Sequence, residues 1–366
     1  MSVNNYIVVG AGMSGAVVAN ELSEAGNKVT VFEAKPVIGG AVRQDEFCGD
    51  EYSVYGPHIF NTSSKRVYEY VSNKIALKPY YHVPLAIYQY EAITLPNGMQ
   101  TLYQIYGEID LEKAMKRLSE DAVYHEYPEN AEDYALAVYG KTIYEKLIKH
   151  YTEKQWGVNC ADVSADILRR LNCGWTWNRD YYGKEYCAIP DGMGYNELIE
   201  KLLARAEVYL EYKPTITEIR NMIRSGSKVI YTGSVDELYN YSHGTLEWRT
   251  TEFRRVIGDT MNMGVAVVYF TDDRPDTRMT NYRYLTTKKE RRRNIVVTET
   301  PGAWCEGKER YYPINTKRNQ DIYEEYKKLA DEDGIYLLGR LGTYKYINMD
   351  RAIMDALGLA ELLLGG

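Results

Sequence analysis

The chain has 366 residues, of which 45% are hydrophobic and 26% are charged. This composition indicates a globular protein of two or three domains and excludes a disordered or fibrous one. The 44 basic and 51 acidic residues leave a net charge of −7, which argues against a nucleic-acid or membrane-surface binder. Tyrosine is unusually frequent, with 36 tyrosines against 5 phenylalanines, and it favours sites where apolar surface meets water or a ligand.

The cysteines and histidines follow no metal-binding spacing, so no metal site is predicted. The cysteines are Cys48, Cys160, Cys173, Cys187 and Cys305. Their odd number predicts free thiols in a reducing compartment. The sequence has no stretch long and apolar enough to span a bilayer, and no basic leader. We therefore expect a cytoplasmic protein that binds neither membrane nor nucleic acid.

The N-terminal segment has the pattern strand, glycine turn, helix, strand, acid. Residues 6–9 form an apolar strand-like run, and a Gly-Ala-Gly-Met-Ser-Gly turn follows at 10–15. A helical pattern then leads to a second strand at 28–32, which ends at Glu33. The complete pattern is typical of a Rossmann-like dinucleotide-binding unit, whereas the glycine turn alone would be a weak signal.

Each glycine of this turn has a geometric reason. Gly10 permits the tight turn, Gly12 lets a pyrophosphate approach the backbone, and Gly15 lets the helix pack on the strand. Met13 and Ser14 begin the helix, whose N-terminal N–H groups and dipole attract phosphate. We expect all five residues to contact the cofactor.

A second glycine pair indicates which dinucleotide is bound. Glu33, followed by Ala34, can accept hydrogen bonds from a ribose diol. Gly39 and Gly40 follow directly and have no Cβ to keep the backbone from the dinucleotide. Flavoproteins that hold FAD have this arrangement, and nicotinamide-only dehydrogenases usually lack it. An ordinary type II turn is the alternative interpretation of the glycine pair.

The remaining elements follow in chain order. The pattern predicts a helix at 63–80, a hairpin at 84–95, mostly helix at 98–171, a loop at 172–190, a helix at 195–206, alternating strand and helix at 207–232, a β-rich segment at 247–312, a strand at 335–338 and a helix at 349–364. The basic run at 288–293 is interpreted as a solvated hairpin loop.

The predicted fold class is α/β, with a Rossmann-like FAD-binding domain that carries a helical insertion and a β-rich insertion. The FAD-binding domain is discontinuous and comprises 1–80, 191–245 and 325–366. The helical domain comprises 98–190 and includes a mobile lid loop over 157–190. The β-sheet substrate domain comprises 81–97 and 246–324.

Several local runs together resemble the UDP-galactopyranose mutase family, occur in the family's order and span nearly the whole chain. They are the glycine turn at 10–15, Tyr-Gly-Pro-His-Ile-Phe at 55–60, Pro-Leu-Ala-Ile-Tyr at 84–88, Tyr-Thr-Glu-Lys-Gln-Trp-Gly at 151–157, Ile-Tyr-Thr-Gly at 230–233, Tyr-Tyr-Pro-Ile-Asn at 311–315 and Gly-Arg-Leu-Gly-Thr-Tyr-Lys-Tyr at 339–346. The run at 151–157 is the most specific of them.

This resemblance implies a flavin-dependent isomerase that interconverts UDP-galactopyranose and UDP-galactofuranose without net oxidation. In the family, N5 of reduced FAD attacks the anomeric carbon and displaces UDP, and the sugar then recloses through another hydroxyl. The family also suggests a homodimer and a place in the biosynthesis of cell-surface glycans that contain galactofuranose.

The resemblance assigns catalytic roles to four residues. Arg170 and Arg340 match the two arginines that bind the diphosphate, and Arg278 matches a third active-site arginine. A guanidinium suits a leaving diphosphate because it can pair with two phosphate oxygens. His58 matches the histidine near flavin N5. A solvated arginine or a core histidine would be the usual interpretation of each residue without its motif.

The resemblance also assigns substrate and cofactor contacts. Tyr151 and Trp156 match the uridine site, although their helical spacing also fits core packing. Tyr346 and either Tyr311 or Tyr312 match a tyrosine cluster that donates to phosphate, and the spacing leaves both of the latter open. The expected cofactor contacts in the C-terminal part are Gly339, Arg340, Tyr346 and Met349.

The chain departs from the family at positions that surround the sugar and diphosphate. Asn61, a predicted substrate contact, replaces a second histidine, and Pro57 replaces an alanine. Gly174 replaces the second arginine of the mobile loop, and Asn348 replaces an aspartate. The exact UDP-sugar therefore stays open. An FAD-dependent oxidoreductase of the amine oxidase or desaturase type, or a non-catalytic UDP-sugar or flavin-binding homologue, are the alternatives.

Overall fold

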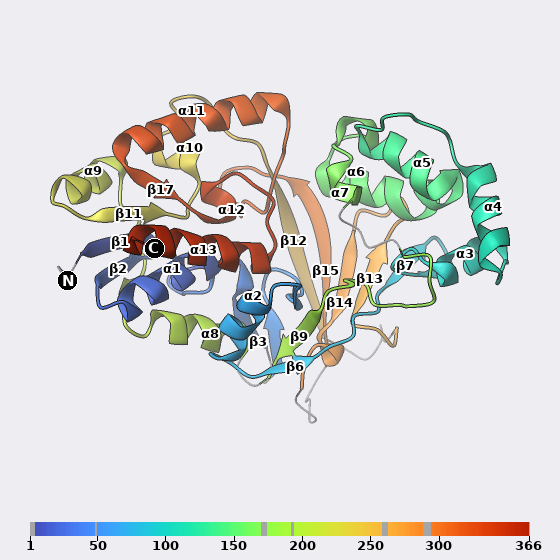
Figure 1. The fold of residues 1–366 in the computed structure, drawn as a ribbon, viewed down its shortest axis with the longest axis horizontal. Helices are drawn as coiled ribbons and strands as arrows, with labels where there is room; N and C mark the ends of the chain where they lie inside the picture. Colours follow the sequence, from blue (N-terminus) through green and yellow to red (C-terminus); the bar gives the residue numbers. More distant parts are fainter. Residues whose placement is uncertain are drawn as a thin grey trace.

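The computed structural model describes residues 4–47, 50–169, 174–191, 194–257, 263–287 and 294–365. Arg170, Cys48, Cys173 and the basic run at 288–293 lie outside the described residues. Figure 1 shows an α/β unit that contains both chain termini, a group of helices on the opposite side, and a long twisted sheet that extends between them.

The α/β unit is built on a five-stranded, wholly parallel sheet. Its strands are β1 (Asn5–Val9), β2 (Lys28–Phe32), β10 (Glu207–Tyr209), β11 (Lys228–Tyr231) and β17 (Ile335–Leu337). The spatial order is β10-β2-β1-β11-β17, so the chain changes direction across the sheet at β1. In such sheets ligands bind at the carboxyl ends of the strands beside this switch point.

Helices cover both faces of this sheet, because side chains along β1 alternate between the faces. Tyr6 and Val8 pack with one group of helices, and Ile7 and Val9 pack with the other. The first group is α1 (Met13–Glu24), α2 (Lys65–Ser72), α8 (Gly194–Leu203) and α13 (Met349–Leu364). The second group is α9 (Ile216–Arg224), α10 (Val235–Leu238) and α11 (Lys317–Asp333). This three-layer arrangement confirms the predicted Rossmann-like α/β fold.

A seven-stranded mixed sheet forms the middle of the molecule (Figure 1). In spatial order its strands are β16 (Tyr312–Pro313), β12 (Trp248–Ile257), β15 (Ile295–Ala303), β14 (Arg278–Asn281), β13 (Val267–Phe270), β7 (Leu85–Tyr88) and β8 (Glu91–Thr94). The β7–β8 hairpin joins the sheet through a parallel pairing with β13. The hairpin predicted at 84–95 is thus confirmed and belongs to this sheet.

A compact helical group packs above the end of this sheet (Figure 1). Its members are α3 (Met99–Tyr106), α4 (Leu111–Asp121), α5 (Ala131–Ile143), a π-helix (Tyr144–Lys149), α6 (His150–Trp156) and α7 (Asp166–Arg169). Side chains of Asp110 and Asn130 cap the N-termini of α4 and α5. The helices share one apolar core, to which the partly buried Tyr312 and Tyr346 are added.

Two predictions about local structure were wrong in part. The helix expected at 63–80 ends at Ser72, and Leu77–Pro79 is strand β6 instead. The loop expected at 172–190 contains strand β9 (Tyr186–Pro190). Both strands pair with each other, and β9 also pairs with β5 (Phe60–Thr62). Because these partners lie more than a hundred residues apart in the sequence, tertiary pairing outweighs the local pattern.

The remaining elements are short. They are β3 (Gln44–Phe47), β4 (Asp50–Ser53), α12 (Gly339–Gly342) and three 3-10 helices at Gly40–Val42, Cys160–Asp162 and Tyr282–Tyr284. Within the described ranges, no helix combines the length and the apolar character that crossing a membrane requires. The same residues hold no cluster of three or more His, Cys, Asp or Glu side chains placed to bind a metal ion.

Candidate active site

The glycine turn lies at the carboxyl edge of the parallel sheet, between β1 and α1. Gly10 has φ +108°, and a Cβ there would collide with Thr232 after β11. A Cβ on Gly15 would collide with the Gly10 carbonyl. The α1 N-terminus has no side-chain cap and no acidic residue in its first turn. It therefore presents backbone N–H groups and a positive dipole end that suit a phosphate.

The second glycine pair packs directly against this turn. Gly12 and Gly39 form an isolated parallel β-bridge, and a Cβ on Gly40 would lie 2.9 Å from Gly12 Cα. Glu33 is buried, and its carboxylate accepts hydrogen bonds from the N–H groups of Ala11 (2.8 Å) and Lys35 (2.9 Å). These bonds fix the carboxylate at the end of β2 and leave it lone pairs for a further donor.

The C-terminal segment completes the same edge. Gly339, at φ +77°, follows β17 and lies against Ser14. The Ser14 hydroxyl donates to the carbonyl of Ala352 on α13, whose N-terminus is not capped by the Asn348 side chain. Met349 begins this helix. Two uncapped helix N-termini, the glycine turn, the Gly39–Gly40 pair and Gly339 thus converge, and this backbone cradle fits the dinucleotide of FAD.

Substitution of Gly15 by alanine should abolish flavin binding, because the added Cβ cannot coexist with the Gly10 carbonyl that shapes the phosphate turn. The check is the ratio of flavin absorbance near 450 nm to protein absorbance in the purified variant. Gly358→Ala is the matched control, since a Cβ there meets no atom within 4 Å. Normal flavin content in Gly15→Ala would contradict the assigned role of this turn.

His58 lies between the parallel-sheet unit and the arginines. Its Nδ1 lies 2.9 Å from the Gly56 carbonyl, and its ring meets Tyr195 edge to face. Burial, with smaller effects from Arg340 and Arg278, lowers the pKa of His58 to about 4. The imidazole is therefore neutral at physiological pH. It lines a small cavity of about 40 Å³ with Gln44, Ser53, Tyr195 and Tyr282, among others.

Arg278 is held by a buried carboxylate on the neighbouring strand. Arg278 on β14 pairs in register with Glu299 on β15. Its Nε and one terminal nitrogen donate to the two Glu299 oxygens at 2.8 and 2.6 Å. The Glu299 side chain is only 4% exposed. A Cβ on Gly56 would lie 2.9 Å from Glu299 and 3.0 Å from Arg278, so the His58 segment packs directly on this pair.

Arg340 is oriented by backbone and by aromatic rings. One terminal nitrogen donates to the Tyr311 carbonyl at 3.0 Å, and the other donates to the Ile347 carbonyl at 2.9 Å. The guanidinium carbon lies 5.8, 5.4 and 5.4 Å from the ring centroids of Tyr311, Tyr312 and Tyr346. No carboxylate pairs with Arg340 in the described part of the chain, so the structure leaves its charge for an anionic ligand.

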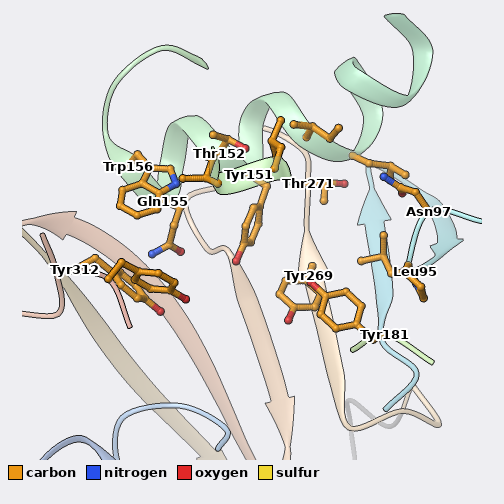
Figure 2. Close-up of a pocket in the computed structure, with 16 residues that line it drawn as sticks. Leu95, Asn97, Tyr151, Thr152, Gln155, Trp156, Tyr181, Tyr269, Thr271 and Tyr312 are labelled. Atoms are coloured by element: carbon orange, nitrogen blue, oxygen red, sulfur yellow. The ribbon is translucent and has the colours of Figure 1, made fainter. Parts of the chain in front are cut away.

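A cavity of about 140 Å³ lies between α6 and the seven-stranded sheet (Figure 2). Tyr151, Gln155 and Trp156 project into it from α6, and Tyr312 faces them. Tyr346 also lines the cavity. Trp156 lies 6.0 and 6.1 Å from the ring centroids of these two tyrosines. Because Tyr312 and Tyr346 also lie beneath Arg340, the aromatic cavity adjoins the cationic part of the site.

The structure separates Tyr311 from Tyr312, which the sequence alone leaves open. Tyr312 lines the cavity, whereas the Tyr311 hydroxyl donates to the Tyr55 carbonyl at 2.5 Å. Tyr312 is therefore the member of this pair that a ligand in the cavity would meet. Burial raises the pKa of Tyr151 and Tyr312 well above 10, so both hydroxyls stay protonated and can donate.

Two other predicted residues, Asn61 and Ala34, do not line the aromatic cavity. The Asn61 amide donates to the Ile59 carbonyl, and within the described ranges its recorded contacts do not reach the arginines or the cavity. Its assignment as a substrate contact stays a prediction. Ala34 is exposed beside Glu33. Arg170 lies outside the described residues.

Several lining residues were missed by sequence reasoning. Tyr181 and Tyr269 stack at 5.9 Å along one wall of the cavity, and Tyr182 interacts electrostatically with Arg278. Gln155 points its amide into the cavity (Figure 2), where its buried nitrogen has no hydrogen-bond partner among the residues that the structure describes. The excess of tyrosine was the signal for the three rings, and Gln155 lies inside the 151–157 run.

His82 is a buried histidine that was also not predicted. It follows β6 and is 1% exposed, and its ring stacks on Tyr182 with the centroids 5.2 Å apart. Among the described residues, Nδ1 has no hydrogen-bond partner. Burial, with a smaller effect of Arg278, lowers the pKa of His82 to about 3. The imidazole is therefore neutral at physiological pH, in the electrostatic field of Arg278.

The buried His82 predicts a pH dependence of stability. Its pKa is lower in the folded state, so between pH 6.5 and about 3 the unfolded state binds the extra proton, and stability rises with pH across this window. Replacing His82 by leucine should reduce the slope by about 1 kcal/mol per pH unit. Urea unfolding midpoints at several pH values check this. Equal slopes for both proteins would show that His82 is protonated in the folded state.

Comparison with known proteins gives one consistent family. The sequence profile of UDP-galactopyranose mutase matches residues 146–346, and that of the NAD(P)-binding Rossmann-like domain matches residues 8–73. A probable UDP-galactopyranose mutase of Klebsiella pneumoniae is 32% identical over 100% of this chain and 96% of its own. A dTDP-fucopyranose mutase of Escherichia coli is 29% identical over 99% of this chain and 98% of its own.

The fold comparison agrees with the sequence comparisons. A crystal structure of reduced UDP-galactopyranose mutase superposes with a TM-score of 0.77. The match covers 100% of this chain and 94% of that one, at 14% sequence identity. The profile match over more than half of the residues and the full-length relative above 30% identity carry the same conclusion. The chain belongs to the UDP-galactopyranose mutase family of isomerases.

Proposed function

We propose that this protein interconverts the pyranose and furanose forms of a nucleotide-linked galactose or a close analogue, with bound reduced FAD. The observation that carries the proposal is one continuous site. An aromatic cavity sized for part of a nucleotide is lined by Tyr312 and Tyr346, and the rings of both also contact the Arg340 guanidinium. The positive charges of Arg340 and Arg278 in turn lower the pKa of His58. This order of subsites matches base, diphosphate, sugar and flavin.

The aromatic cavity would hold the pyrimidine. Tyr151 and Trp156 offer ring faces to a flat base, and the Gln155 amide offers a donor to an oxygen of the ligand. Tyr312, kept protonated by burial, can donate to a phosphate oxygen at the border with Arg340. Desolvation of these groups makes each hydrogen bond to the ligand stronger than it would be in water.

The arginines would bind the diphosphate and receive its developing charge when the bond to the sugar breaks. Arg340 is rigidly held and has no carboxylate partner among the described residues, so we assign it the main role. Arg278 retains only part of its donor capacity, because Glu299 takes two of its N–H groups. Arg170 is assigned the same role by its motif.

FAD, held by the glycine cradle and Glu33, would supply the nucleophilic N5 when it is reduced. The protein's own part is to exclude water and to hold the sugar near His58. Neutral His58 can accept or donate a hydrogen bond without adding positive charge next to the two arginines. A neutral His58 ring therefore leaves the binding of the negatively charged diphosphate to the arginines.

The proposal is tested by incubating dithionite-reduced protein separately with UDP-galactopyranose and with dTDP-fucopyranose. The dTDP-sugar is included because a full-length relative is a dTDP-fucopyranose mutase. We expect a furanose product, separable by anion-exchange chromatography, from at least one substrate, and no turnover by the oxidised protein. If reduced protein binds the nucleotide and forms no furanose from either sugar, the mutase proposal fails.

A further inference from the structure

Lys154 occupies an unusual place within the 151–157 run. Its side chain leaves α6 and enters the connection between β13 and β14, which spans residues 271–277. There the ammonium donates to four backbone carbonyls: Phe270 at 2.9 Å, Asp272 at 2.8 Å, Arg274 at 2.9 Å and Asp276 at 2.9 Å. Three N–H groups serve four acceptors, so the connection is wrapped around one cation.

This connection is stiff and ends at Arg278. The Asp272 carboxylate accepts two bonds from the Arg274 guanidinium, at 2.7 and 2.6 Å, and one from the Gln89 N–H at 2.9 Å. Arg278 is the first residue of β14 and comes directly after the connection, and its side chain donates to Glu299. The position of the Lys154 ammonium is thereby coupled through a braced turn to the active-site guanidinium.

The backbone of the same helix turn is held by a second cation. Arg249 on β12 donates to the carbonyls of Gln155 (3.0 Å) and Lys154 (2.8 Å) at the C-terminus of α6. Gly157, at φ +74°, ends the helix, and a Cβ there would collide with the Arg249 guanidinium. Two cations thus attach the end of α6 to two different strands of the seven-stranded sheet.

We propose that Lys154 is a positioning residue that holds the base subsite and the Arg278 subsite at a fixed spacing. This inference rests on the proposed function. Tyr151, Gln155 and Trp156 lie on the helix that Lys154 attaches, and Arg278 lies at the end of the turn that Lys154 gathers. Lys154 itself does not line the cavity and would not touch the nucleotide.

A fixed spacing has a measurable consequence for a ligand that fills both subsites. UDP carries a base and a diphosphate, so its second contact forms at the high effective concentration set by the first. If the Lys154 side chain is removed, each subsite can still bind its own fragment of UDP. The distance between the two subsites is then no longer fixed at the value that lets one UDP molecule fill both. The affinity gain of UDP over its fragments should then fall, although each fragment keeps its affinity.

The experiment measures dissociation constants of uridine, inorganic pyrophosphate and UDP for the flavin-loaded protein and for Lys154→Met. We expect UDP to bind the variant about 10- to 100-fold more weakly. Uridine and pyrophosphate should each change less than about threefold, within the scatter of independent sites. Lys149→Met, five residues earlier at the end of the π-helix, is the matched control, and we expect it to bind all three ligands like the unmodified protein.

Equal loss for all three ligands, or no loss for any, would overturn the inference. If Lys154→Met does not retain flavin and a cooperative unfolding transition, Lys154→Gln replaces it, because the amide preserves two N–H donors at smaller cost. Failure of the proposed function is measured separately, as the absence of any furanose product when the unmodified reduced protein is given either nucleotide sugar. The inference about Lys154 is judged from the titrations of the variant, so the two failures are distinguishable.

Discussion

Replacing Arg340 by alanine should lower turnover of the nucleotide sugar by about 100- to 1,000-fold while flavin stays bound. Arg340 is fixed by the carbonyls of Tyr311 and Ile347 and by three tyrosine rings, and no described carboxylate neutralises it. A preorganised cation of this kind stabilises charge that develops on the leaving diphosphate. The measurement is kcat of the reduced variant, with flavin content determined from the visible spectrum.

Arg351→Ala serves as the control for this prediction. Arg351 lies exposed on α13, and within the described ranges its ion pair is with Asp355 one turn away, so its loss should leave turnover unchanged. Turnover of Arg340→Ala within a few-fold of the unmodified protein would remove Arg340 from the diphosphate site. A loss of flavin together with activity would instead place Arg340 in the support of the cofactor.

Replacing Glu299 by leucine should destabilise the protein by about 3–5 kcal/mol, because Arg278, whose side chain is 17% exposed, would lose the buried carboxylate that neutralises it. Arg278 donates two short hydrogen bonds to Glu299 on the adjacent strand, and the Glu299 side chain is 4% exposed. The shift of the urea unfolding midpoint of the flavin-loaded protein measures this effect. The expected loss exceeds that of an exposed ion pair several-fold.

The double variant Arg278→Met with Glu299→Leu separates the causes of this loss. If the unpaired buried charge is responsible, the double variant should recover most of the stability that the single variant loses. The same double variant should remain inactive if Arg278 also serves the diphosphate. A double variant as unstable as Glu299→Leu alone would show that packing against Gly56, rather than charge, determines the loss.

The cofactor-binding edge could be predicted closely because its signals are local. Gly15 is required because a Cβ there would meet the carbonyl of Gly10 five residues earlier, Gly10 has a φ of +108° within the same turn, and Glu33 follows directly from the end of β2. Residues with such short-range causes can be recognised from spacing alone. The division of the chain into three domains, with the boundaries expected from the sequence, stays a prediction.

The parts that could not be predicted depend on partners distant in the sequence. Strand β9 exists because it pairs with β5 and β6, and Asn61 bonds locally once β5 forms. The roles of His82 and Lys154 follow from residues more than a hundred positions away. A pattern in one segment carries no information about which carbonyls or rings another segment brings to it.

The tyrosine excess illustrates the same limit. Tyr312 lines the cavity, whereas the adjacent Tyr311 bonds to a backbone carbonyl outside it. Tyr181 and Tyr269, which have no motif, stack along the cavity wall. Composition predicted that tyrosine would gather where apolar surface meets a ligand, but only tertiary packing distinguishes the rings that do so.

Turnover under strict exclusion of oxygen tests the central claim most directly, namely that one site binds a nucleotide sugar and isomerises it without net oxidation. The flavin is reduced once, excess substrate is added, and NMR of the furanose anomeric proton is recorded with the visible spectrum. We predict many equivalents of furanose per flavin while the flavin absorbance near 450 nm stays bleached. Product limited to one equivalent, or return of that absorbance as substrate is consumed, would contradict the claim and indicate an oxidoreductase.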